Sequence, residues 1–283
     1  MFNINLQVKR GEVFGFIGTN GSGKTTTIRN LMGFIKPDKG STSVCGLDSW
    51  KSSAEIMENV SYVPGEIAFP SLATGTEFLK SQAEYLGVKD FSYMNHIIEL
   101  LQLDPTAKLK RMSKGMKQKT AIVAALMGEK DILVLDEPTT GLDPLMRDAF
   151  LDLVREERDK GHTIFLSSPI FEEIEAVCDR VAMIRDGSII ETVSLYDLRH
   201  PKIKEFMVEF ANDGELKKYT SHTEFNILKT ENGICYINVP TEKLNSFFRE
   251  LKSYKATNLR ETHLSLQKEF MKAYKGGSSN GSK

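Results

Sequence analysis

Residues 18–25 read GTNGSGKT, a stretch with the pattern G-x-x-x-x-G-K-[ST]. A mostly apolar segment, Glu12–Ile17, precedes it and is predicted to form a strand, and Lys24–Phe34 follows it and is predicted to form a helix. The glycines permit backbone angles and close approaches that a side chain would block. Exposed backbone N–H groups and the helix N-terminus can then surround a phosphate group. The stretch therefore predicts a phosphate-binding loop.

Two side chains of this loop carry specific expectations. Lys24 is expected to neutralise the β- and γ-phosphate oxygens of a nucleotide, and the Thr25 hydroxyl to ligate Mg²⁺. The alternative is a glycine-rich turn without a ligand, which the flanking strand and helix disfavour. The residues expected to contact phosphate are Gly18, Thr19, Asn20, Gly21, Ser22, Gly23, Lys24, Thr25 and Thr26.

A second motif, Leu135-Asp136-Glu137-Pro138, ends the short apolar run Ile132–Leu135. A carboxylate at the end of a buried strand costs free energy unless a cation compensates it. Asp136 is therefore expected to hold Mg²⁺ through water, and Glu137 to polarise an attacking water as a general base. The alternative is a pair of acids that caps the next helix. The phosphate loop, about 110 residues earlier, favours the catalytic interpretation.

Strands and helices alternate over about the first 200 residues, a pattern typical of an α/β fold with a mainly parallel sheet. The further strands expected are Ser41–Cys45, Val60–Val63, Ile132–Leu135, Thr163–Ser167 and Val181–Arg185. The helical segments expected are Thr76–Leu103, Ser113–Met127, Pro144–Lys160 and Phe171–Cys178.

The pattern changes after Leu198. Residues 201–275 are expected to form a small α+β unit with the β-α-β-β-α-β order of ferredoxin-like folds. Its expected strands are Lys204–Phe210, Phe225–Leu228, Gly233–Val239 and Ala256–Arg260, with helices at Thr241–Lys252 and Leu264–Tyr274. The tail at 276–283 is rich in glycine and serine and is expected to be flexible.

Composition excludes several classes of protein. The net charge of −1 over 283 residues gives no reason to expect a nucleic-acid partner or direct binding to an anionic membrane. Lys9, Arg10 and Glu12 interrupt any apolar N-terminal signal, and the run Ala121–Met127 is far shorter than the roughly 20 residues of a membrane helix. The three cysteines are widely spaced, which favours a reducing compartment over a disulfide scaffold or a zinc site.

Two more motifs complete a recognisable set: Ser113-Lys114-Gly115-Met116-Lys117-Gln118 and Gly141-Leu142-Asp143-Pro144. With the phosphate loop and the LDEP carboxylates, they resemble the nucleotide-binding subunit of an ABC transporter over residues 1 to about 200. The variant SKGMKQK and the C-terminal extension are similar to those of the bacterial export branch. The resemblance implies a P-loop NTPase fold, RecA-like, with a helical subdomain at about 70–127.

The family resemblance also implies partners and cofactors. It implies ATP with Mg²⁺, a head-to-tail homo- or heterodimer, and a separate transmembrane permease that holds the chain at the cytoplasmic face of the cell membrane. Each phosphate loop would face the signature helix of the other subunit, where Ser113 and Gly115 would offer a hydroxyl and backbone N–H groups to the γ-phosphate. Asp143 would cross the interface, and it also suits the N-cap of a helix that begins at Pro144.

The chain departs from the family pattern at three places. Pro169 stands where the family has a histidine near the γ-phosphate, and His162, upstream, is interpreted as a surface residue. Gly65 replaces an expected glutamine, with Glu66 next to it. Lys24 lies very near the N-terminus, where the family has further strands and an aromatic that stacks on adenine; Phe2 is the early candidate, and it fits better as a strand residue.

Three functional hypotheses follow. The first is an ATPase subunit that powers export. The second is a nucleotide-binding partner with weakened hydrolysis, which Pro169 motivates and Glu137 opposes. The third is a soluble ABC protein that acts on ribosomes or DNA, which the single nucleotide unit and the lack of a coiled-coil insertion or basic patch disfavour.

Overall fold

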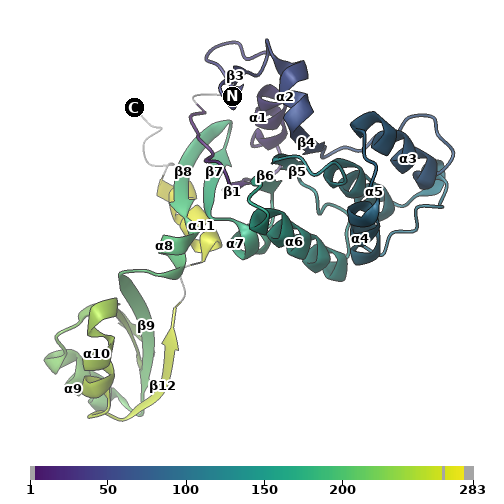
Figure 1. Cartoon of the computed structure of the whole chain (residues 1–283). Helices are drawn as coiled ribbons and strands as arrows, with labels where there is room; N and C mark the ends of the chain where they lie inside the picture. The colour runs from purple at the N-terminus through teal and green to yellow at the C-terminus, as the bar shows by residue number, and fades with distance from the viewer. Residues whose placement is uncertain (1–3, 263–264, 277–283) are drawn as a thin grey trace. The chain divides into compact units, whose positions relative to one another are not determined.

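A computed structural model describes residues 4–262 and 265–276 of the chain. The chain divides into two compact units (Figure 1). The first unit comprises Met1–Leu195 with Lys272–Lys283, and the second comprises Tyr196–Met271. Phe2, the early aromatic interpreted as a strand residue rather than an adenine-stacking one, and the tail at 277–283 lie outside the described residues.

The first unit is built on a six-stranded sheet in the order β4-β5-β6-β1-β7-β8. Neighbouring strands run parallel except for the last pair, β7 and β8, which is antiparallel. The α/β fold with a mainly parallel sheet is therefore confirmed. The strands are β1 (Val13–Ile17), β4 (Val60–Val63), β5 (Ile132–Asp136), β6 (Thr163–Ser168), β7 (Arg180–Arg185) and β8 (Ser188–Ser194).

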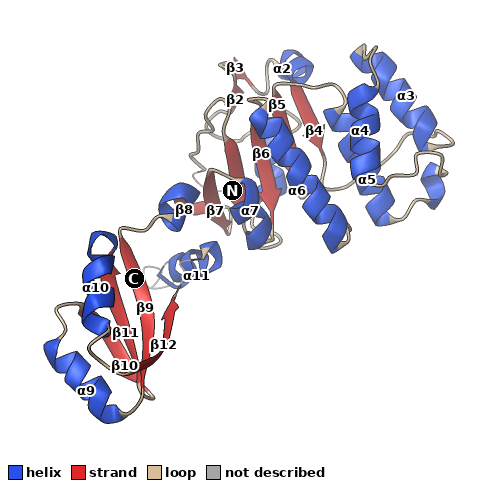
Figure 2. Ribbon diagram, turned by 60° about the horizontal axis from the view of Figure 1, so that its bottom comes forward, coloured by secondary structure: helices blue, strands red, loops and turns tan. Residues whose placement is uncertain are grey.

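Both faces of this sheet are covered, which explains the continuous apolar runs of its central strands. Phe14 and Phe16 face a cluster that includes Ile28 of α1, whereas Gly15 points the other way. A side chain at Gly15 would lie 2.7 Å from Ile174 of α7. Helices α1 and α7 thus lie on opposite faces; Figure 2 shows α7 beside α6.

The helices of the first unit are α1 (Lys24–Leu31), α2 (Ser53–Asn59), α3 (Gly75–Leu86), α4 (Ser92–Leu100), α5 (Lys114–Leu126), α6 (Pro144–Asp159) and α7 (Phe171–Val177), with a 3₁₀ turn at Leu109–Arg111. The expected helical stretch 76–103 is two helices, because Gly87 adopts a φ of 70° and ends α3. Helices α3, α4 and α5 form the helical part of the unit (Figure 1).

One expected strand is much shorter than predicted. Residues 41–45 contribute only β2 (Ser43–Val44), which pairs with β3 (Leu47–Asp48). Cys45 and Gly46 between them have φ values of 50° and 83°, which fits a two-residue hairpin turn. The turn reverses the chain before a longer strand can form.

The second unit has the expected β-α-β-β-α-β order, with the antiparallel sheet β10-β11-β9-β12 of a ferredoxin-like fold. Its first helix, Asp213–His222, was not among the segments expected to be helical. Its elements are β9 (Ile203–Phe210), α9 (Asp213–His222), β10 (Asn226–Glu231), β11 (Ile234–Pro240), α10 (Leu244–Leu251) and β12 (Ala256–Glu261), and the chain also forms α8 (Leu195–Arg199) and α11 (Leu266–Gly276). Phe247 lies fully buried in its core, with ring centroids 5.0 Å from Phe206 and 5.6 Å from Phe225.

None of the helices in the described part of the chain is long and apolar enough to cross a membrane. The described residues also contain no cluster of three or more histidine, cysteine or acidic side chains that could cage a metal ion.

Candidate functional site

The phosphate loop lies at the carboxyl end of β1, seated against β7. A side chain at Gly18 would lie 2.4 Å from the backbone oxygen of Ile184, so only glycine fits there. Gly21 and Gly23 have φ values of 79° and 110°, in the left-handed region that glycine adopts without strain. The loop therefore needs its glycines for close packing as well as for backbone angle, and it delivers the chain into α1.

Lys24 is the first residue of α1, and its side chain turns back into the loop. Its Nζ donates hydrogen bonds to the backbone oxygens of Gly18 at 2.8 Å and Thr19 at 3.3 Å. It also forms an ion pair with Oε1 of Glu137 at 3.1 Å. The lysine is 3% exposed, so its charge is compensated within the site rather than by water.

Asp136 ends β5 beside β6 and is fully buried. The Ser167 hydroxyl donates to its Oδ1 at 2.7 Å, whereas Oδ2 has no hydrogen-bond partner among the described residues. Burial raises the pKa of Asp136 above its ordinary value, against the lowering effect of the Ser167 and Thr25 hydroxyls. Glu137 raises this pKa further, and Lys24 lowers it.

These groups fit a hard divalent cation. A buried carboxylate oxygen that lacks a partner costs free energy, and a cation would supply the missing compensation. One carboxylate with a nearby hydroxyl, completed by water and substrate phosphate, is the type of coordination that Mg²⁺ favours over an all-protein cage. Asp136 and Thr25 are therefore the residues that could hold Mg²⁺ here.

Glu137 has an unusual backbone, with a φ of 48°. Its N–H donates to the backbone oxygen and to the hydroxyl of Ser167, both at 3.1 Å, which ties the strained residue to β6. Such angles in a residue other than glycine cluster at functional sites. The side chain is 25% exposed, so its carboxylate is reachable from solvent as well as from Lys24.

Gly65, at the position where the resemblance predicts a glutamine, adjoins Asp136. A Cβ built at Gly65 would lie 3.3 Å from Oδ2 of Asp136. The position is therefore beside the candidate metal ligand but has no side chain to offer it. Glu66, the next residue, is exposed.

The signature and the Asp143 motif form a second cluster. The Ser113 hydroxyl caps α5 by accepting from the Met116 N–H at 3.2 Å, and Asp143 caps α6 by accepting from the Met146 N–H at 3.0 Å. A side chain at Gly115 would lie 2.7 Å from the backbone oxygen of Gly141, so the two motifs pack together. No hydrogen bond or ion pair between described residues joins Ser113, Gly115 or Asp143 to the phosphate loop.

One interpretation from the sequence is wrong. His162 is not a surface residue: its side chain is only 13% exposed, and Nδ1 lies 2.8 Å from Oε2 of the buried Glu157. It takes no part in the site. Pro169 is exposed on the turn after β6.

Sequence reasoning missed Ser167, Ser168 and Glu173, which form hydrogen bonds around the site. A signal was present for the two serines, because polar residues at the carboxyl end of an otherwise apolar strand point to the ligand edge of a parallel sheet.

A glycine loop connects β1 to α1, and its lysine pairs with the carboxylate that follows β5, which lies two strands from β1 in the sheet. These features define a P-loop nucleotide hydrolase. Comparison with known proteins then narrows the class. The profile of the family described as ABC transporter matches residues 1–140. The chain belongs to this family. It is an ATP-binding subunit of the ABC type and an ATPase.

Relatives extend this match through most of the chain. The bacitracin transport ATP-binding protein BcrA of Bacillus licheniformis is 32% identical and aligns with 88% of this chain and 91% of its own length. The Nod factor export ATP-binding protein I of Burkholderia orbicola (strain AU 1054) is 32% identical over 83% of this chain and 80% of its own length. A solved structure of an ATP-binding subunit of an ABC transporter is 32% identical, with a TM-score of 0.61, over 69% of this chain and 83% of that one.

Proposed function

We propose that this chain hydrolyses ATP to drive export through a separate membrane-spanning subunit. The observation that carries the proposal is the contact of Lys24 with Glu137 at 3.1 Å, beside a buried Asp136 oxygen that lacks a partner. This arrangement supports the proposed roles of Lys24 as a phosphate-binding cation, Asp136 as a metal ligand and Glu137 as a general base.

The ion pair between Lys24 and Glu137 would describe the site before ATP binds. Lys24 has two backbone oxygens and one carboxylate as partners. A γ-phosphate carries more negative charge than a carboxylate, so bound ATP would take over Lys24 and release Glu137. Glu137 would then accept the proton of the attacking water while Lys24 stabilises charge on the transferred phosphoryl group. Mg²⁺, held by Thr25 and Asp136, would neutralise the phosphate oxygens.

The second cluster supports a dimer. Ser113 and Gly115 form no hydrogen bond with the phosphate loop among the described residues, yet they have the hydroxyl and backbone N–H groups that suit a γ-phosphate. A second ATP-binding subunit, the same chain or a different one, would supply them in trans. Asp143 would contact that subunit near the nucleotide while it continues to cap α6.

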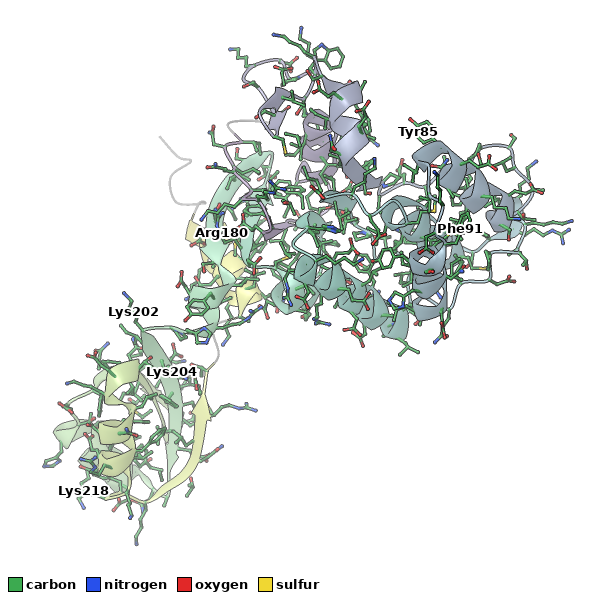
Figure 3. All side chains as sticks on the ribbon, viewed as in Figure 1. Tyr85, Phe91, Arg180, Lys202, Lys204 and Lys218 are labelled. Atoms are coloured by element: carbon green, nitrogen blue, oxygen red, sulfur yellow. The ribbon has the colours of Figure 1, made fainter. Side chains whose placement is uncertain are left out.

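The membrane partner would contact residues 65–71 and the helical part. Aromatic side chains are exposed there: Tyr85 is 86% exposed and Phe91 is 41% exposed (Figure 3). The two relatives described above are named for transport and export, which supports export by this chain as well. The chain would thus work at the cytoplasmic face of the cell membrane, held by its membrane subunit.

A second candidate function rests on Pro169. Proline has no side-chain donor for a γ-phosphate, which favours a nucleotide-binding partner with weak hydrolysis that pairs with a more active subunit. Steady-state ATP turnover of the purified chain, alone and after Pro169→His, separates the two. Ordinary wild-type turnover with little gain from histidine supports the active subunit. A barely measurable wild-type rate that rises with Pro169→His would overturn it in favour of the weak partner.

A further inference from the structure

Glu173, in the first turn of α7, is a buried carboxylate that the mechanism above leaves without a role. It is 4% exposed. Its Oε2 accepts two hydrogen bonds from hydroxyl groups, one from Thr139 at 2.9 Å and one from Ser168 at 2.6 Å. Its Oε1 is also buried and has no hydrogen-bond partner within the part of the chain that the structure describes.

The two donors belong to two different turns beside the nucleotide site. Thr139 lies in the turn that follows Glu137, where the N–H of Thr140 donates to the backbone oxygen of Glu137 at 3.1 Å. Ser168 ends β6, directly before Pro169, and its hydroxyl also accepts from the N–H of Ile170 at 3.0 Å. One carboxylate oxygen therefore links two turns: the turn after Glu137, the proposed general base, and the turn at Pro169, where the family pattern has a histidine.

A purely local role for Glu173 does not explain this geometry. An acid in the first turn of a helix interacts favourably with the helix dipole from a solvent-exposed position. Glu172 occupies that position in the same turn and is exposed. Glu173 instead points inward, and its described bonds go to hydroxyls on other elements. One oxygen of Glu173 thus holds two hydroxyls that belong to different elements.

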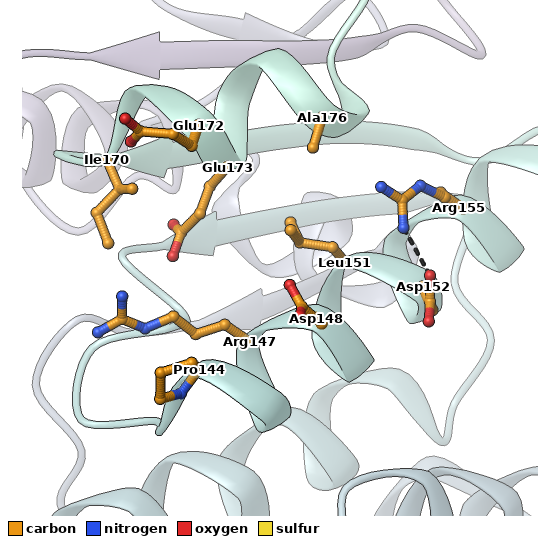
Figure 4. A pocket seen from close by; sticks show the side chains of 10 residues that line it. All are labelled: Pro144, Arg147, Asp148, Leu151, Asp152, Arg155, Ile170, Glu172, Glu173 and Ala176. Carbon is orange, nitrogen blue, oxygen red and sulfur yellow. Dashed lines mark hydrogen bonds and ion pairs between the residues drawn. The ribbon is translucent and has the colours of Figure 1, made fainter.

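The space around Glu173 makes this link easy to test. Its side chain lines a pocket of about 630 Å³ between α6 and α7, together with Arg147, Leu151 and Arg155 (Figure 4). Removal of the carboxylate would enlarge an existing pocket rather than leave a sealed cavity. A shortened side chain at position 173 therefore removes the link without creating a sealed cavity.

We infer that Glu173 is a positioning residue: through Thr139 and Ser168 it holds the Glu137 turn and the Pro169 turn in one fixed geometry. The inference rests on the proposed function, because the geometry matters for catalysis only if Glu137 is the general base. Glu137 has a strained backbone angle, so its turn needs ties of this kind to stay in place. Because Pro169 has no side-chain donor, the position of the general base would depend more on the fixed Glu137 turn.

The test is steady-state ATP hydrolysis by Glu173→Ala, Glu173→Gln and the double variant Thr139→Val with Ser168→Ala, with Glu172→Gln as the matched control. A displacement of about 1 Å costs on the order of 100-fold in rate, so kcat should fall about 10- to 100-fold in Glu173→Ala while KM for ATP stays within about twofold. Glu173→Gln retains an acceptor oxygen and should recover most of the rate. The double variant should match Glu173→Ala, and adding Glu173→Ala to it should cost little more.

Amide hydrogen exchange of residues 137–142 is measured in the same variants. Faster exchange there in Glu173→Ala, but not in Glu172→Gln, supports the link even if the wild-type chain proves inactive and the proposed function fails. The inference is overturned if Glu173→Ala keeps wild-type kcat in an active enzyme, if Glu172→Gln loses as much, or if exchange in this segment does not change.

Discussion

Tyr93→Phe tests how the helical part is joined to the sheet in the first unit. The Tyr93 hydroxyl of α4 donates to Oε1 of Glu157 in α6, a carboxylate that is 1% exposed. The same carboxylate accepts from Lys160 at 2.9 Å and pairs with His162 at 2.8 Å. Phenylalanine preserves the ring, and with it the contact of the Lys160 Nζ at 3.4 Å from the ring centroid. The substitution therefore removes one hydroxyl donor from a buried anion.

The size of the effect follows from that geometry. A hydrogen bond to a charged group contributes about 1.5–3 kcal/mol. In a unit of roughly 200 residues, 1 kcal/mol corresponds to about 2–4 °C in the melting midpoint, so Tyr93→Phe should lower it by about 3–12 °C. Tyr85→Phe is the matched control, because Tyr85 is 86% exposed, and it should melt within about 1 °C of wild type.

The pH dependence has a definite sign. Burial opposes ionisation of Glu157, but hydrogen bonds from Tyr93, Lys160 and His162 together hold its pKa below the ordinary value of 4.5. A carboxylate with a lowered native pKa stabilises the fold fully above its unfolded pKa and loses that contribution as pH falls through the native pKa. The Tyr93→Phe deficit should thus be complete at pH 7 and shrink below about pH 4.5. A deficit that is absent at pH 7, or that grows in acid, would refute the reasoning.

Two further predictions concern the metal site and the second unit. Asp136→Asn removes the charge of the proposed Mg²⁺ ligand, so the Mg²⁺ concentration for half-maximal ATP hydrolysis should rise at least about 10-fold; an unchanged Mg²⁺ dependence would exclude Asp136 from the metal site. Phe247→Ala should destabilise the second unit by about 3–5 kcal/mol, because its ring is fully buried against two other aromatic rings. Chemical denaturation, followed through the amide NMR signals of second-unit residues, measures this change. A loss of less than about 1 kcal/mol in the free energy of unfolding would contradict the packing.

Much of the fold was accessible from the sequence because its central strands are buried on both faces. The runs at Val13–Ile17 and Ile132–Asp136 contain few polar residues and end at functional motifs, so pattern and motif agree. Strand β8 at Ser188–Ser194 was missed because it lies at the sheet edge and is only partly buried along its length. Its residues lack the apolar run of a central strand.

The site divides in the same way. Lys24, Thr25, Asp136 and Glu137 could be proposed from the sequence, because a local motif specifies each of them. The role of Ser167 and the bond between Glu173 and Thr139 depend on partners about 30 residues away in the chain, which no local pattern encodes. His162 was misinterpreted for a similar reason. Its partner is Glu157, near the end of α6, and the sequence did not reveal that this carboxylate is buried.

The most direct test of the account is ATP hydrolysis by Glu137→Gln compared with wild type, followed by size-exclusion chromatography with ATP and Mg²⁺. Glutamine occupies the same space but cannot accept a proton, so the hydrolysis rate should fall by about 10²- to 10⁴-fold. Since Lys24 and the rest of the phosphate loop are unchanged, ATP should still bind, and the variant should accumulate as an ATP-bound dimer. Wild-type turnover by Glu137→Gln, or the absence of any ATP-dependent dimer, would contradict the account.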